Sequence, residues 1–144
     1  MGKITKEVKK MVYIFVGVAG ILGALSRYYL GLSINTWWHQ DFPLATLSIN
    51  LIGCFILSWL TMYISRLNIL HPYLVTGIGT GFVGSFTTFS TFSVETVKLI
   101  QSSHWGIALL YILSSLWGGL FMSWLGFKIG DFFFKKRTQK QPAS

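Results

Sequence analysis

Long apolar runs separated by short polar stretches dominate the sequence. Four of these runs reach the roughly 20 residues that a helix needs to cross a bilayer: Met11–Leu32, Leu44–Ile64, Tyr73–Ile100 and Trp105–Phe127. None alternates apolar and polar residues with the period of two that is typical of barrel strands, and lipid tolerates only helices or closed barrels. The pattern therefore predicts an all-α integral membrane protein with four transmembrane helices.

Composition supports one membrane domain. The chain has 144 residues, close to the roughly 150 of a single domain. Hydrophobic residues make up 52% and charged residues 11% of it, against about 25% charged in soluble domains. Mean hydropathy is +0.57. With a single cysteine, these values exclude a disordered chain, a disulfide scaffold and an ordinary soluble enzyme. We expect one four-span domain over residues 1–144, with basic tails at 1–10 and 128–144.

The net charge of +8 is concentrated outside the spans. With four spans, both termini share one side, and that side carries ten basic residues: Lys3, Lys6, Lys9, Lys10, Arg66, Lys128, Lys135, Lys136, Arg137 and Lys140. The other side has only Arg27 and Lys98. The positive-inside rule then predicts a multi-pass cell-membrane protein with both termini in the cytoplasm.

Small residues repeat at helical spacing in three of the spans: Gly17, Gly20 and Gly23; Gly77 and Gly81; and Ser115, Gly119 and Ser123. Such stripes let helix backbones approach closely in lipid, so packing within or between subunits is expected at each. Because four short helices enclose little interior for a pore, we expect an oligomer.

The third run is an unusual membrane span. It carries four glycines followed by six hydroxyl residues: Gly77, Gly79, Gly81, Gly84, Ser85, Thr87, Thr88, Ser90, Thr91 and Ser93. This composition favours a helix interrupted at membrane depth, which is tolerated only where protein or a watery cavity covers it. We place the break at Gly84–Thr88. An ion or substrate site on freed backbone groups and plain flexible packing remain equally open.

Aromatic and amide side chains accompany the predicted break. Phe89 and Phe92 share a helix face, and their positive ring edges suit a small anion, although packing is the commoner role of such a pair. Asn50 lies inside the second run, with Thr46 one turn before it. A buried amide must face protein or water, so Asn50 is either an interhelical hydrogen-bonding residue or a donor to an anion.

Two charged residues lie in or near the spans. Arg27, near the outer end of the first span, is expected to have a structural role. Glu95 is the only carboxylate within a span, and Lys98 at i+3 allows a surface ion pair; a proton or cation relay would need Glu95 to be buried. The three histidines do not cluster as metal ligands, and no catalytic motif is present. We therefore do not expect an enzyme.

A family resemblance follows from three stretches. Gly81–Glu95, reading GFVGSFTTFSTFSVE, resembles the signature of the Fluc (CrcB-like) fluoride channels. Gly20–Tyr28 and Ala45–Gly53 resemble the same family, so that with the four-span layout the likeness covers nearly the whole chain.

The resemblance implies passive export of cytoplasmic fluoride, which confers fluoride resistance, through an antiparallel dual-topology dimer with two pores. It also implies functions for individual positions. The fluoride pore would involve Phe89, Phe92, Asn50, Ser90, Thr91, Thr46 and Tyr111. Arg27 and Glu95 would be structural or vestibule residues, and the backbone carbonyls of Gly84 and Thr87 would hold a structural sodium ion (Na+) at the dimer interface.

Two departures from the family pattern bear on this interpretation. Gly119 stands where family members often have a pore serine, and Ser115 or Ser123 could substitute for it. The ten-to-two charge bias also exceeds that expected of a dual-topology homodimer, so a homodimer and a fixed-topology heterodimer with a paired homologue stay open. Two further functions compete with a fluoride channel: a proton-coupled small-cation exporter based on Glu95, and a non-transporting scaffold.

Overall fold

The computed structural model describes residues 2–64, 75 and 77–138, and every element in these ranges is helical. In chain order the elements are α1 (Gly2–Asn35), α2 (Leu44–Trp59), η1 (Leu60–Ile64), η2 (Gly77–Val83), α5 (Gly84–Phe86), α6 (Phe89–Gln101) and α7 (Trp105–Thr138). The predicted all-α architecture is confirmed.

Three helical segments of the described chain are long and apolar enough to cross a membrane: Lys10–Asn35, Leu44–Tyr63 and Trp105–Thr138. They agree with the first, second and fourth predicted runs, and the protein is a multi-pass membrane protein. The predicted third run, Tyr73–Ile100, is divided among η2, α5 and α6 where it is described. Its residues 73, 74 and 76 lie outside the described residues, as does Arg66.

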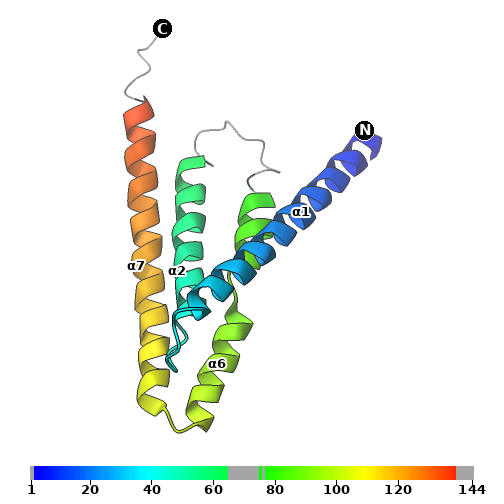
Figure 1. Ribbon diagram of the computed structural model, residues 1–144. Coiled ribbons are helices and arrows are strands. Elements are labelled where there is room, and N and C mark those ends of the chain that lie inside the picture. The colour runs from blue at the N-terminus through cyan, green and yellow to red at the C-terminus, as the bar shows by residue number, and fades with distance from the viewer. Residues whose placement is uncertain (1, 65–74, 76, 139–144) are drawn as a thin grey trace.

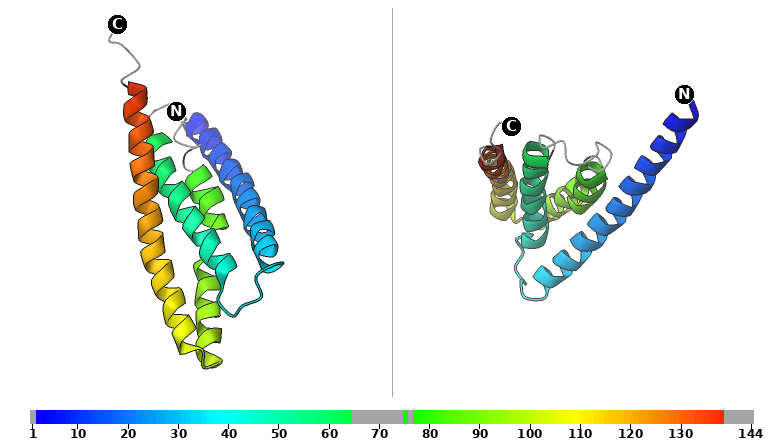
Figure 2. Two further views of the ribbon diagram at one scale, coloured as in Figure 1. Left: turned by 60° about the vertical axis from the view of Figure 1, so that its left-hand side comes forward. Right: turned by 90° about the horizontal axis from the view of Figure 1, so that it is seen from above.

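The helices form two packed groups (Figure 1). The α2 helix runs along α7, while α1 crosses over η2 and α5. Figure 2 shows α1 diverging from the other helices toward its N-terminal end. That end and the C-terminal end of α7 lie at the same end of the molecule, and α6 with the α6–α7 turn lies at the opposite end. This arrangement places the α5–α6 junction midway along the bundle.

Glycines allow the helices to approach one another this closely. A Cβ added at Gly23 of α1 would overlap the carbonyl group of Phe82 in η2. On α7, a Cβ at Gly126 would lie 2.5 Å from the Phe55 carbonyl oxygen of α2. Among the described residues, nothing lies within 4 Å of a Cβ added at Gly17, whereas a Cβ at Gly20 or Gly23 would meet η2 or α5.

Most large apolar side chains point away from the protein. The buried cluster is small, consisting of Leu47, Leu99, Ala108 and Tyr111 where α2, α6 and α7 meet. Most large apolar residues of α1 and α7 are exposed on the isolated chain. Because lipid is as apolar as a protein core, outward-facing hydrophobic residues are expected of membrane helices.

Candidate functional site at the α5–α6 junction

The backbone leaves the helical conformation between α5 and α6. Thr87 and Thr88 are extended, with φ/ψ of −77°/159° and −149°/119°. The new helix is capped by Thr88, whose Oγ1 accepts a hydrogen bond from the Thr91 backbone N–H at 3.2 Å. Threonine is among the preferred N-cap residues because its oxygen satisfies one of the free N–H groups of the first turn.

Asn50 of α2 holds this extended segment with both ends of its amide. Its Oδ1 accepts from the Thr88 backbone N–H at 2.8 Å, and its Nδ2 donates to the Thr88 carbonyl oxygen at 3.0 Å. An amide nitrogen has two hydrogens, so one further donor position is left on Nδ2 after this bond. Asn50 is thus an interhelical hydrogen-bonding residue that retains one donor.

Two backbone carbonyls at the junction lose the donors that a continuous helix would supply. The i+4 donor for Gly84 is the Thr88 N–H, which donates to Asn50 instead. The i+4 donor for Thr87 is the Thr91 N–H, which donates to the Thr88 hydroxyl. Carbonyl oxygens of unwound membrane helices are suited to coordinating Na+. The residues present therefore fit the cation site that the resemblance implies.

A groove of about 570 Å³ opens at the junction. Residues from α2, η2, α5, α6, α7 and the junction itself line it, among them Asn50, Thr88, Phe89, Phe92 and Ser115. The Phe89 and Phe92 ring centroids are 5.8 Å apart, and the Phe89 side chain is 79% exposed on the isolated chain. The amide and both aromatic rings predicted from sequence therefore line one groove.

Hydroxyl groups cluster at the start of α6. The Thr88 hydroxyl donates to Thr91 Oγ1 at 3.0 Å and lies 3.2 Å from Ser90 Oγ. Ser90 and Thr91 are exposed. Each hydroxyl both donates and accepts, so the cluster offers a short polar surface beside the aromatic pair.

A second hollow, of about 390 Å³, lies beyond Thr88, which lines both cavities. Arg27, Thr46, Thr91 and Glu95 are among its walls. Glu95 is the anchor of this region: it accepts a hydrogen bond from the Thr46 hydroxyl at 2.9 Å and one from the Tyr111 hydroxyl at 2.8 Å. It therefore ties α6 to both α2 and α7.

Glu95 also borders a third hollow, of about 340 Å³, near the end of the molecule that carries the α6–α7 turn. Asp41, Lys98 and His104 line this hollow, and His104 Nε2 lies 3.8 Å from Asp41 Oδ2. The three hollows follow α6 from that turn to the junction, with Glu95 and Thr88 at the two shared walls.

Comparison with known proteins identifies the family. Residues 14–127 match the family described as CrcB-like protein, Camphor Resistance (CrcB). The chain belongs to this family. A Bacillus cereus relative described as fluoride-specific ion channel FluC 1 is 68% identical over 136 residues, which cover 94% of each chain. A relative from Geobacillus kaustophilus, described as fluoride-specific ion channel FluC 2, is 51% identical over 81% of this chain and 91% of its own.

The CrcB-like resemblance is thus confirmed, and the structure places the candidate residues close to one another. Asn50, Phe89 and Phe92 line the first groove, and Arg27 and Thr46 line the second hollow. The Tyr111 ring is fully buried, 5.0 Å from that of Phe92. Gly119 lies beside Cys54, whose Sγ would be 3.6 Å from an added Cβ.

Sequence reasoning gave Thr88 no function of its own. In this CrcB-like fold Thr88 caps α6, binds Asn50 and separates the two larger hollows. A threonine directly before an apolar helical stretch is an N-cap signal, so the sequence did contain a clue. Its pairing with a residue 38 positions earlier has no local signal.

Proposed function

We propose that this chain is a subunit of a fluoride-selective channel that exports cytoplasmic fluoride passively and so confers fluoride resistance. The observation that carries the proposal is the groove at the α5–α6 junction, where the Asn50 amide faces the same space as Phe89 and Phe92. The fluoride-specific names of relatives at 66–68% identity support it.

The groove offers a graded replacement for the water around fluoride. Removing an ion from water without other partners is very costly. The remaining Asn50 donor and the positive ring edges belong to this groove, whereas Thr91 lines the second hollow. Together with the exposed Ser90 hydroxyl, these groups are weak partners in series. Conduction needs sites that are favourable enough to enter and weak enough to leave. No group in this set must change protonation, in agreement with passive transport.

A second subunit completes the pore in this proposal. Phe89 is 79% exposed although it lines the groove, and a second chain packed against this face would cover its ring. We assign the assembly as an antiparallel dimer in which each chain has four spans, the third broken between α5 and α6. The carbonyls of Gly84 and Thr87 face the central Na+ in this arrangement.

The charge bias favours a fixed orientation with both termini in the cytoplasm, and hence pairing with a homologue of reversed bias. The relatives bear both FluC 1 and FluC 2 names, which is compatible with paired chains. A homodimer is the alternative.

Fluoride efflux from liposomes that contain this chain alone tests the function. Release measured with a fluoride electrode, with chloride retained, is the expected result for a homodimer. If release appears only after the paired homologue is added, the heterodimer is correct. The absence of release in both cases contradicts the channel. Efflux that requires a pH gradient and disappears in Glu95→Gln would instead establish a proton-coupled exporter.

A further inference from the structure

The last part of α7 lies beyond the residues that match the family model. The family match ends at Phe127, whereas α7 continues without interruption to Thr138. We refer to Lys128–Thr138 as the basic extension. It holds four cations and one carboxylate: Lys128, Lys135, Lys136, Arg137 and Asp131.

Helix length places the basic extension outside the hydrocarbon core. A helix rises about 1.5 Å per residue, so Trp105 and Trp124 are about 28 Å apart along α7. This matches the core thickness of about 30 Å, and tryptophan favours both membrane interfaces. Both rings are exposed, and Lys128 Nζ lies 5.9 Å from the Trp124 ring centroid. The residues directly after Trp124, Lys128 among them, therefore enter the headgroup region, and the rest of the basic extension continues past it on the same side of the membrane.

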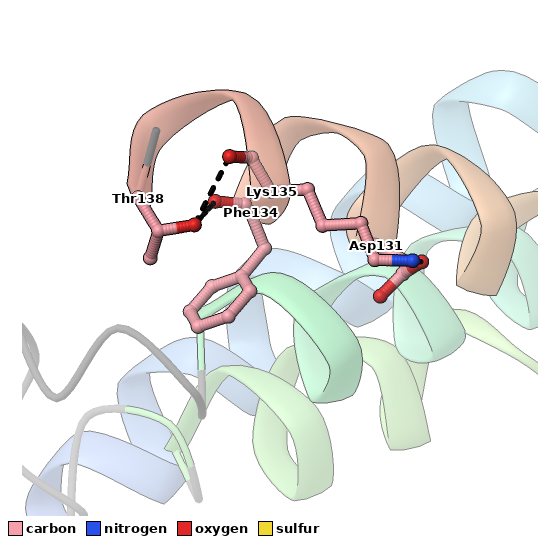
Figure 3. A network of polar contacts seen from close by, with 4 residues as sticks. All are labelled: Asp131, Phe134, Lys135 and Thr138. Atoms are coloured by element: carbon pink, nitrogen blue, oxygen red, sulfur yellow. Dashed lines mark hydrogen bonds and ion pairs between the residues drawn. The ribbon is translucent and has the colours of Figure 1, made fainter. Parts of the chain in front are cut away.

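The basic extension combines exposed cations with exposed rings. Lys135 Nζ is paired with Asp131 Oδ2 at 2.6 Å, one turn away on the same side of the helix (Figure 3). Lys136 and Arg137 are exposed, and Phe132 is 61% exposed. Because Lys128, Phe132 and Lys136 are spaced at i, i+4 and i+8, they share one stripe of the helix.

We propose that the basic extension binds the phosphate headgroups of anionic phospholipids in the leaflet at which α7 ends. Cations next to a membrane helix attract anionic lipids, and each contributes a several-fold gain in binding. The exposed phenylalanine in the same stripe favours a membrane surface over a fully aqueous partner such as nucleic acid. This inference does not depend on the proposed transport activity.

Native mass spectrometry of the full chain in neutral detergent tests it, with equal phosphatidylglycerol and phosphatidylcholine added. The wild type should retain phosphatidylglycerol preferentially. The triple variant Lys128→Gln, Lys136→Gln, Arg137→Gln should lower that preference about tenfold or more. Since these side chains are exposed, the variant should elute like the wild type in gel filtration.

A charge-matched control is available on α1. The variant Lys3→Gln, Lys6→Gln, Lys10→Gln removes the same charge and should lower the preference less than the α7 variant does. Equal losses in the two triple variants, or equal retention of the two lipids by the wild type, would overturn the proposal. Displacement of the lipid by inorganic phosphate as effectively as by added phosphatidylglycerol would also overturn it, because the site would then bind free anions.

Discussion

The α1–η2 contact and the contact of α2 with the α5–α6 junction are stabilised in opposite ways. Where α1 crosses η2, Gly23 lets the backbones touch, and apolar packing suffices. At the α5–α6 junction, backbone groups are released, and the Asn50 side chain must bind them. The first contact depends on the lack of a side chain and the second on the presence of a particular one. Packing and function are thereby assigned to different residues.

We expect the largest effect from a substitution at the glycine contact between α1 and η2. Gly23→Leu should abolish recovery of folded protein, because even a Cβ there overlaps the Phe82 carbonyl group. Gly17→Leu, six residues earlier on the same helix, meets open space among the described residues and should fold normally. Gel filtration of the two variants in detergent measures the difference. Equal recovery of both would show that the α1–η2 contact is not needed for folding.

Gly53 of α2 combines features of the glycine contact and the polar contact. It lets the helix approach the α5–α6 junction closely, because an added Cβ would overlap Thr87 Cγ2. Gly53→Ala should lower the free energy of unfolding by about 1–3 kcal/mol, which is the usual cost of overpacking. Adding Thr87→Ser removes that methyl but keeps the hydroxyl that donates to the Val83 carbonyl oxygen at 3.0 Å. The double variant should recover most of the loss, as measured by thermal unfolding in detergent. If it does not, the clash lies elsewhere.

At the polar contact, Asn50→Ala should be folded but impaired. Losing the two bonds to Thr88 should cost about 1–2 kcal/mol, the range of hydrogen bonds between membrane helices. Fluoride efflux from the assembly that conducts should fall by about tenfold or more, because the remaining anion donor disappears with the amide. Ser48→Ala, on the same helix two residues earlier, is the control and should retain efflux. If Asn50→Ala and the wild type release fluoride equally fast, Asn50 does not contribute to the pore.

We expect the smallest effect from removing one hydrogen bond to Glu95, next to the polar contact. Tyr111→Phe keeps the buried ring and its packing on Phe92 but deletes the hydrogen bond to Glu95 at 2.8 Å. We expect the free energy of unfolding, measured by thermal unfolding in detergent, to fall by about 0.6–1 kcal/mol, since Thr46 still binds Glu95. Tyr63→Phe is the control, because Tyr63 lies in η1, at the end of the second span far from Thr46 and Glu95. A loss as large as that of Asn50→Ala would mean that Glu95 is as critical as the junction itself.

Much of the fold was accessible from sequence because membrane insertion is a local property. Hydropathy over about 20 residues predicts a span, and three of the four predicted runs correspond to long apolar helices in the structure. The glycine-to-hydroxyl run predicted an interruption at Gly84–Thr88, and the backbone is extended at Thr87 and Thr88. Asn50, Phe89 and Phe92 also stood out, because polar groups and aromatic pairs at such positions require a reason.

The sequence by itself thus determined the membrane class, the helix-forming segments and the residue types available for a site. Tertiary structure alone decided the partners. Asn50 binds the Thr88 backbone, and Glu95 is bound by Thr46 and Tyr111 although Lys98 is nearer in sequence. Hydrogen bonds form only within about 3 Å. Which groups come that close depends on how whole helices pack, and no local pattern contains that information.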